Sequence, residues 1–139
     1  MLNSPNFMCP REPFGFGSYS ATPPLYSYTH YVINQRLSGI PGHATYKKWR
    51  KQAQLTKPSE VLLLIDSRNK SNYIISGSSA TGGGAGFRHG NNKQGGDVYY
   101  GDANIAYGDG HAGTESFKQV NTLTRLDEGY NTKSGAPQE

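Results

Sequence analysis

The apolar residues of this chain gather in a few short runs, and the longest covers residues 61–65, Val-Leu-Leu-Leu-Ile. Glu60 precedes this run and Asp66 follows it. An apolar run of strand length with polar ends is typical of a strand that is buried on both faces of a sheet. We therefore expect a central strand at this position. Residues 72–76 predict a second strand, and residues 31–33 predict a short third one.

A hairpin is predicted in the second half of the chain, where polar and apolar residues alternate. Every second residue from 103 to 107 is apolar, so these side chains share one face of a strand. Residues 108–110, Gly-Asp-Gly, favour a tight turn because glycine tolerates positive φ. We expect residues 111–120 to return as the partner strand, with Phe117 as its main apolar anchor.

Helical periodicity is clearest in residues 43–55. Tyr46, Trp49 and Ala53 follow one another at steps of three and four residues, which places them on one apolar stripe. This segment predicts one short helix. Pro58 should end it, because the residue before a proline disfavours the helical region.

The composition fits a sheet with long ordered loops better than a helical bundle. The 139 residues include 18 glycines, 8 prolines and 10 tyrosines, and only 34% of them are hydrophobic. Loops are expected at residues 1–29 and 76–86, where the breakers gather. The length suits one domain with a modest core. We place that domain at residues 1–129 and expect a loose tail at residues 130–139.

The net charge of +4 is not spread evenly. The segment 47–57 has no acidic residue, and its basic side chains are Lys47, Lys48, Arg50, Lys51 and Lys57. We interpret this segment as the solvated face of the predicted helix. A basic patch for nucleic acid, with Tyr46 and Trp49 stacking on bases, stays open as an alternative.

Cys9 is the single cysteine, so the chain cannot form an internal disulfide. No stretch reaches the roughly 20 apolar residues of a membrane span. Residues 1–10 lack the basic start and the apolar run of a signal peptide. Taken alone, the chain is expected to carry neither a membrane span nor an export signal.

Several segments together resemble a known family. They are Phe-Met-Cys-Pro at 7–10, the aromatic segment 28–34, Pro-Ser-Glu to Asp-Ser at 58–67, Phe-Arg-His-Gly at 87–90, and the segment 103–111 that ends in Gly-Asp-Gly-His. In this order they resemble the prepilin-type processing-associated proteins, which are named for a His, nine residues and then Asp-Gly. The resemblance covers about residues 7–120.

The chain departs from this family in two ways. Nineteen residues separate His89 from Asp109 instead of nine, so residues 91–100 look like an insertion in a surface loop. Family members also begin with a cleaved leader and a long apolar helix, which are not found here. We therefore expect the globular part of a longer protein, or a chain whose partner supplies the helix.

The resemblance implies an α+β, pilin-like globular head with an antiparallel sheet, one short helix and long ordered loops. It also implies a structural, non-enzymatic subunit of a bacterial pilus- or pseudopilus-like filament, located extracellularly or at the cell surface. Such a subunit assembles with copies of itself or with a helix-bearing chain, and needs no cofactor or small-molecule substrate. The signature residues would lock the hairpin structurally: Arg88, His89, Asp109, Gly110 and His111.

Two kinds of chemistry stay open as alternatives. Asp66, His89, Asp109 and His111 have the donor atoms of a divalent transition-metal site, and Asp97, Asp102 and Asp109 have those of a calcium site. A hydrolase would use His89 or His111 as the base, Asp66 or Asp109 to orient it, and Ser78, Ser79 or Thr81 as the nucleophile. The sequence contains neither a Gly-x-Ser-x-Gly nor a His-Glu-x-x-His motif. We therefore expect structural hydrogen bonds rather than catalysis or metal binding.

Overall fold

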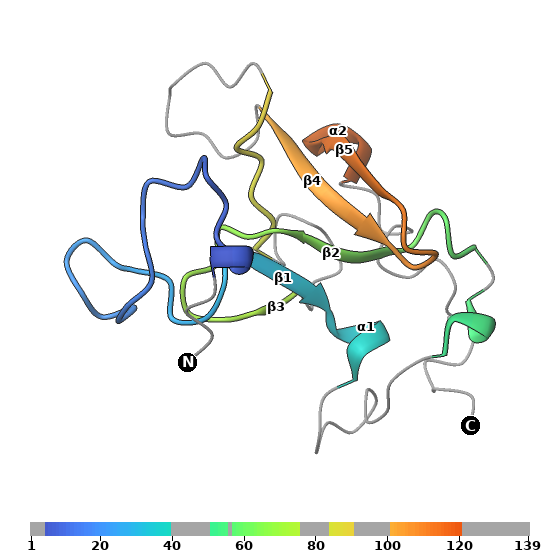
Figure 1. Ribbon diagram of the computed structural model, residues 1–139, viewed down its shortest axis with the longest axis horizontal. Helices are drawn as coiled ribbons and strands as arrows, with labels where there is room; N and C mark the ends of the chain where they lie inside the picture. The colour runs from blue at the N-terminus through green and yellow to red at the C-terminus, as the bar shows by residue number, and fades with distance from the viewer. Residues whose placement is uncertain (1–4, 40–50, 56, 76–83, 91–100, 121–139) are drawn as a thin grey trace.

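The computed structural model describes residues 5–39, 51–55, 57–75, 84–90 and 101–120. These residues form a sheet-rich fold around five strands in the spatial order β3-β1-β2-β4-β5 (Figure 1). The strands are β1 (Tyr31–Asn34), β2 (Leu62–Asp66), β3 (Ile74–Ile75), β4 (Asp102–Tyr107) and β5 (Ala112–Ser116).

The predicted central strand is confirmed, because β2 lies in the middle of the sheet and pairs antiparallel with both β1 and β4. Leu62 and Ile65 are buried, whereas Leu63 and Leu64 keep partial exposure. The expected antiparallel pairing holds for β1–β2, β2–β4 and β4–β5, but not for the whole sheet. β3 pairs with β1 in parallel, so the sheet is mixed.

The predicted hairpin is confirmed, with β4 and β5 antiparallel over five residue pairs from Asp102↔Ser116 to Ala106↔Ala112. Gly110 has a φ of 94° in the connecting turn, which explains why a glycine stands there. The partner strand, however, ends at Ser116 and not at Val120. The side-chain oxygen of Gln119 accepts hydrogen bonds from the Ser116 backbone N–H and hydroxyl, at 2.9 and 2.7 Å. The bond from the Ser116 N–H to the Gln119 side chain is one half of a capping box, and it stands at the start of the short helix α2 (Phe117–Val120).

Helical structure is scarce in the described residues. Besides α2 there are α1 (Gln35–Ser38) and two 3-10 turns, η1 (Pro5–Phe7) and η2 (Gln52–Gln54). The helix expected at 43–55 lies mostly outside the described residues, and its described end, 51–55, forms only η2. The expected domain boundary after residue 129 also lies outside them. Within the described ranges, no helix is both long and apolar enough to cross a membrane.

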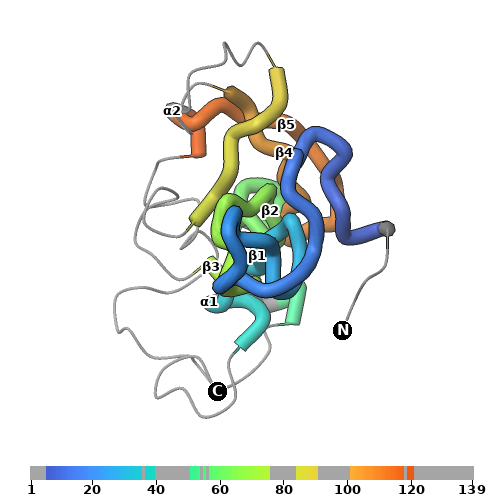
Figure 2. Tube along the Cα trace, turned by 90° about the vertical axis from the view of Figure 1, so that its left-hand side faces the viewer, coloured from blue at the N-terminus to red at the C-terminus, as the bar shows by residue number. Residues whose placement is uncertain are grey.

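The hydrophobic core lies between the sheet and the segments that precede β4 and follow β5. Phe87 and Phe117 pack edge to face there, with ring centroids 5.4 Å apart. Figure 2 shows the segment 84–90 (yellow) and α2 (orange) on the same side of the strands. The buried core residues are Val32, Leu62, Ile65, Ile75, Ala85, Phe87, Ala103, Ile105, Tyr107 and Val120.

The N-terminal loop lies at one end of the sheet, where Figure 1 shows it in blue. The expected loop character of residues 1–29 is confirmed for the described part, in which short turns alternate with irregular chain. Tyr26 anchors this loop, because it is buried and its hydroxyl lies 3.0 Å from the backbone oxygen of Ser67. The ring of His30 packs against Tyr26 and Phe16 at centroid distances of 4.5 and 4.7 Å. The loop is therefore held against the residues that follow β2.

Candidate functional site

Asp66 is the centre of a buried polar cluster at the end of β2. The strand pairing places it beside Tyr31 of β1, and its side chain is fully buried. The backbone N–H of Asn104 in β4 donates a 2.7 Å hydrogen bond to Asp66 Oδ2. The apolar run that forms β2 thus carries an ionisable residue into the interior at its last position.

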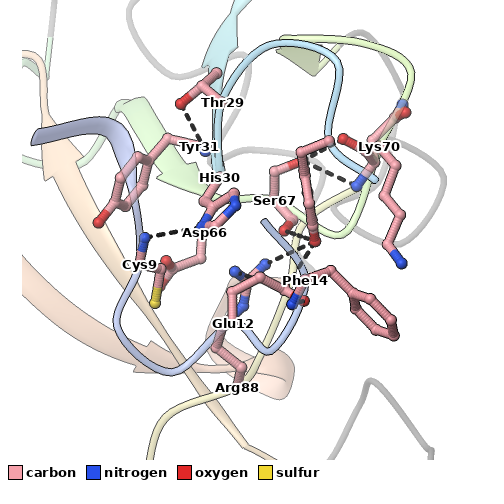
Figure 3. Close-up of polar contacts among 12 residues, drawn as sticks. Cys9, Glu12, Phe14, Thr29, His30, Tyr31, Asp66, Ser67, Lys70 and Arg88 are labelled. Carbon is pink, nitrogen blue, oxygen red and sulfur yellow. Dashed lines mark hydrogen bonds and ion pairs between the residues drawn. The ribbon is translucent and has the colours of Figure 1, made fainter. Parts of the chain in front are cut away.

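Cys9 reaches the same place from the N-terminal loop. It is buried, and its backbone N–H donates a 2.9 Å hydrogen bond to Nδ1 of His30, as Figure 3 shows. Its Sγ lies 3.4 Å from Nε2 of His89. The sequence analysis drew from Cys9 only that the chain cannot form an internal disulfide, although the Cys-Pro pair at residues 9–10 was part of the family resemblance. That pair was the one signal that could have found it.

His89 joins the cluster from the segment 84–90. Its backbone N–H and C=O pair with those of Asp102, with both hydrogen bonds at 2.9 Å. The Gly86 N–H donates to the Asp66 carbonyl at 2.7 Å and fixes the start of the segment. His89 Nε2 then lies 3.1 Å from Asp66 Oδ2 and 3.0 Å from Asn104 Nδ2.

The arrangement brings a thiol and a carboxylate to the same ring nitrogen of one imidazole. A nucleophilic relay places the nucleophile and the orienting carboxylate on opposite nitrogens of the imidazole, so that a proton passes from one to the other. Here Cys9 and Asp66 both contact Nε2 of His89. The geometry therefore differs from a relay, whereas three donor atoms that converge on one point are typical of metal ligands.

Burial dominates the electrostatics of the cluster. It raises the pKa of Asp66, although the Asn104 N–H and then Arg88, His89 and the Cys9 thiol act in the opposite direction. Burial also lowers the pKa of the His30 ring. Asp66 Oδ1 and His30 Nε2 have no hydrogen-bond partner among the residues that the structure describes.

A second polar group adjoins the cluster and ties the loop to the segment 84–90. Arg88 forms an ion pair with Glu12 at 2.9 Å, and both side chains are largely buried (Figure 3). The hydroxyl of Tyr26 donates a 2.8 Å hydrogen bond to the same Glu12 oxygen. Burial raises the pKa of this hydroxyl. Arg88, one of the residues on which the sequence resemblance rests, is thus part of an ion pair between the N-terminal loop and the segment 84–90.

The predicted signature and metal residues separate into two places. Asp66 and His89 meet at the beginning of β4, whereas Asp109, Gly110 and His111 follow its other end, in the turn to β5. Figure 1 shows the two ends of β4. The structure therefore does not pack His89 against this turn, and it does not bring the four proposed metal ligands together. Asp102 and Asp109 of the calcium alternative are separated along β4 in the same way.

Several other candidate residues lie outside the described residues. They are Ser78, Ser79 and Thr81 of the hydrolase alternative, Asp97 of the calcium alternative, and Lys47, Lys48 and Arg50 of the basic patch. Lys51 is described and is exposed next to η2.

Asp109 and His111 form a local pair in the turn, and this pair affects the pKa of Asp109. The His111 backbone N–H and ring Nδ1 lie 3.0 and 2.6 Å from Asp109 Oδ1, and the His111 ring stacks on Tyr107. The backbone N–H first, and then the ring, hold the pKa of Asp109 below its ordinary value. The pair therefore adds stability above the unfolded-state pKa of Asp109, and this is lost as the pH falls through the folded-state pKa.

We predict that His111→Ala raises the pKa of Asp109 only part of the way back, because the alanine keeps the backbone N–H that contributes most. NMR titration of the Asp109 carboxyl carbon measures this shift. An unchanged pKa would show that the ring does not contribute.

A groove on the surface is the second notable feature of the described residues. It has a volume of about 740 Å³ and is lined by the aromatic residues Phe7, Tyr28 and Tyr73 together with Gly17, Ser18, Ser27 and Thr29. None of these residues is charged. The rings of Tyr28 and Tyr73 meet edge to face with centroids 5.2 Å apart.

The cluster joins three segments of the chain, with Cys9 and Asp66 buried and His89 partly buried, whereas the groove is open and aromatic. These features suit different roles, the first in holding the fold together and the second in contact with another molecule. Models of known protein families, curated proteins and solved structures were all compared with this chain, and none of them matched it.

Proposed function

We propose that this chain is the globular, pilin-like head of a structural subunit in a bacterial pilus- or pseudopilus-like surface filament. In this proposal the protein is not an enzyme, and it acts by packing against other subunits outside the cell or at its surface. The observation that carries the proposal is the aromatic groove, which offers an uncharged contact surface on a sheet-rich head.

The side chains of the groove have the character of interface residues. Tyr28 and Tyr73 are each 50% exposed and Phe7 is 39% exposed. Exposed aromatic residues that gather in one place mark contact surfaces, because they bury a large area with few rotatable bonds. Their gathering around one groove supports a contact with another protein.

The backbone around the groove is fixed by the sheet. The Tyr73 carbonyl accepts a hydrogen bond from the Ile33 N–H at 2.9 Å, next to β3. The Phe7 carbonyl accepts one from the His30 N–H at 3.2 Å, just before β1. Side chains on such a fixed rim lose less conformational entropy when a partner binds. The groove is therefore pre-organised for docking.

The charge of the chain favours assembly through this surface. Copies that each carry a net charge of +4 repel one another, and the repulsion is strongest where basic residues face each other. The described lining of the groove carries no charge, so docking there avoids placing like charges in contact. The occupant that we propose is a second copy of the chain, or the head of a similar helix-bearing subunit.

The sequence resemblance supports the same proposal. Phe7 and Tyr28 belong to two of the segments that resemble the prepilin-type proteins. A chain of that family would gain its membrane contact from a helix supplied by a longer form of the protein or by a partner.

We predict that Tyr28→Ser combined with Tyr73→Ser weakens self-association at least tenfold, because the variant removes two of the three exposed rings in the groove. Sedimentation equilibrium over a wide concentration range measures this effect, and electron microscopy of the native material tests for filaments. Tyr19→Ser is the matched control, since Tyr19 is 53% exposed but does not line the groove.

The expected result is that the control associates as the unchanged protein does. A protein that stays monomeric at every concentration, with neither filaments nor a co-purifying helix-bearing chain, would contradict the proposed function. Equal self-association of the double variant and the unchanged protein would contradict the role of the groove.

A further inference from the structure

We propose that Cys9, Asp66 and His89 bind one zinc ion or a similar divalent transition-metal ion. Such an ion would fasten the N-terminal loop and the segment 84–90 to the end of β2. This site is distinct from the aromatic groove, and it does not depend on filament assembly.

The distances between the donor atoms carry the proposal. The Cys9 Sγ, one Asp66 carboxylate oxygen and one His89 ring nitrogen all lie within 4.8 Å of one another. His89 Nε2 is 3.4 Å from Cys9 Sγ and 3.1 Å from Asp66 Oδ2. Ligand atoms of a tetrahedral zinc site lie about 3.3–3.6 Å apart, given bonds of about 2.3 Å to sulfur and 2.0–2.1 Å to nitrogen and oxygen. The two distances from His89 Nε2 therefore need to change by only a few tenths of an ångström to fit a tetrahedral zinc site.

Hydrogen bonds alone do not give every polar atom of this cluster a partner. One ring nitrogen either donates a single proton or offers a single lone pair. His89 Nε2 nevertheless faces a thiol, a carboxylate and the amide nitrogen of Asn104. Asp66 Oδ1 is buried and has no hydrogen-bond partner in the described part of the chain. A cation between the three side chains would use the lone pairs that point inward.

The chemistry of the donors indicates the class of metal. A thiolate and an imidazole select zinc and other divalent transition ions over calcium and magnesium, which prefer oxygen ligands. A thiolate and a carboxylate together balance the charge of one divalent ion. This neutrality matters because Cys9 is 2% exposed and Asp66 is fully buried, where an unbalanced charge is costly.

Neighbouring residues already hold the ligands in place, as the outer partners of metal sites do. His30 accepts the hydrogen bond of the Cys9 backbone, and the Asn104 N–H fixes Asp66 Oδ2. The backbone pair with Asp102 fixes His89. The three ligands come from remote parts of the chain, so an ion would cross-link them where a lone cysteine cannot form a disulfide.

Metal binding by the purified full chain tests the proposal directly. After treatment with EDTA and its removal, calorimetry with Zn²⁺ should give one tight site and a higher melting temperature. Co²⁺ should give the visible and thiolate charge-transfer absorption of tetrahedral coordination that includes sulfur. This spectrum needs no variant, so it remains informative if a substitution prevents folding.

Variants assign the ligands. Cys9→Ser and His89→Gln should each weaken Zn²⁺ binding at least tenfold, and Cys9→Ser should abolish the charge-transfer absorption. His111→Gln is the matched control, since His111 also pairs with an aspartate but lies at the other end of β4. It should leave binding unchanged.

The absence of a thiolate band with Co²⁺ in the unchanged protein would overturn the proposal. Equal Zn²⁺ binding by Cys9→Ser and the unchanged protein would do the same, as would loss of binding in His111→Gln alone. None of these results bears on self-association, so the metal site and the proposed function can fail separately.

Discussion

Replacing Phe87 by alanine should lower the free energy of unfolding by about 4 kcal/mol, which is in the range for truncating a buried aromatic residue. Phe87 is 2% exposed and packs edge to face against Phe117. It is the residue through which the segment 84–90 contributes to the core. Urea unfolding followed by circular dichroism measures the change as a lower midpoint with an unchanged slope.

The cavity left by this substitution cannot close easily, because the backbone around it is fixed. The segment is held by the hydrogen bond of Gly86 to Asp66 and by the pair between His89 and Asp102. A side chain at Gly101 would collide with the carbonyl oxygens of Phe87 and His89, which shows how closely the two stretches of chain pack. The full cost of an unfilled cavity is therefore expected.

Tyr19→Ala is a suitable comparison, since it removes an aromatic ring that is 53% exposed. This variant should lose less than about 1 kcal/mol. If Phe87→Ala lost as little as Tyr19→Ala, the segment 84–90 would not be packed against the sheet as described.

The sequence predicted those elements whose signal is local. The apolar run at residues 61–65 has the length and polar ends of a central strand, and β2 occupies that position. Alternation at residues 103–107 gave the buried face of β4. The end of β5 could also have been predicted, because Ser116 and Gln119 have the sequence spacing of a capping box, which indicates the start of a helix. Phe117, which lies seven residues after Gly110, was instead given too much weight as an apolar anchor of the strand.

The candidate site depended on contacts between residues far apart in sequence, and these have no local signal. Cys9 and His89 are 80 residues apart, and only the folded loop brings them together. The family resemblance suggested that His89 and Asp109 lock the same hairpin, although nineteen residues separate them. In the structure His89 instead pairs with Asp102, the first residue of β4, so that the length of the strand separates it from Asp109. The sequence therefore indicated which side chains have the donor atoms of a metal site, but it did not indicate which of these side chains lie together.

Arg88→Met should lower the free energy of unfolding by about 3 kcal/mol, because it leaves the carboxylate of Glu12 buried without its cation. The two side chains are 12% and 9% exposed, so solvent screens the ion pair weakly. Methionine keeps much of the apolar stem of the arginine, which isolates the loss of charge. Thermal and urea unfolding measure the effect.

A double-mutant cycle separates the ion pair from the packing of the two side chains. Glu12→Gln alone leaves the guanidinium without its anion, although the Tyr26 hydroxyl can still donate to the amide oxygen. Combining it with Arg88→Met removes both charges, so the loss should be about 2 kcal/mol smaller than the sum of the two single losses. Lys57→Met tests the exposed pair Lys57–Glu60 and should change stability by about 0.5 kcal/mol or less. Strict additivity at Arg88 and Glu12 would mean that the signature arginine holds the N-terminal loop by packing alone.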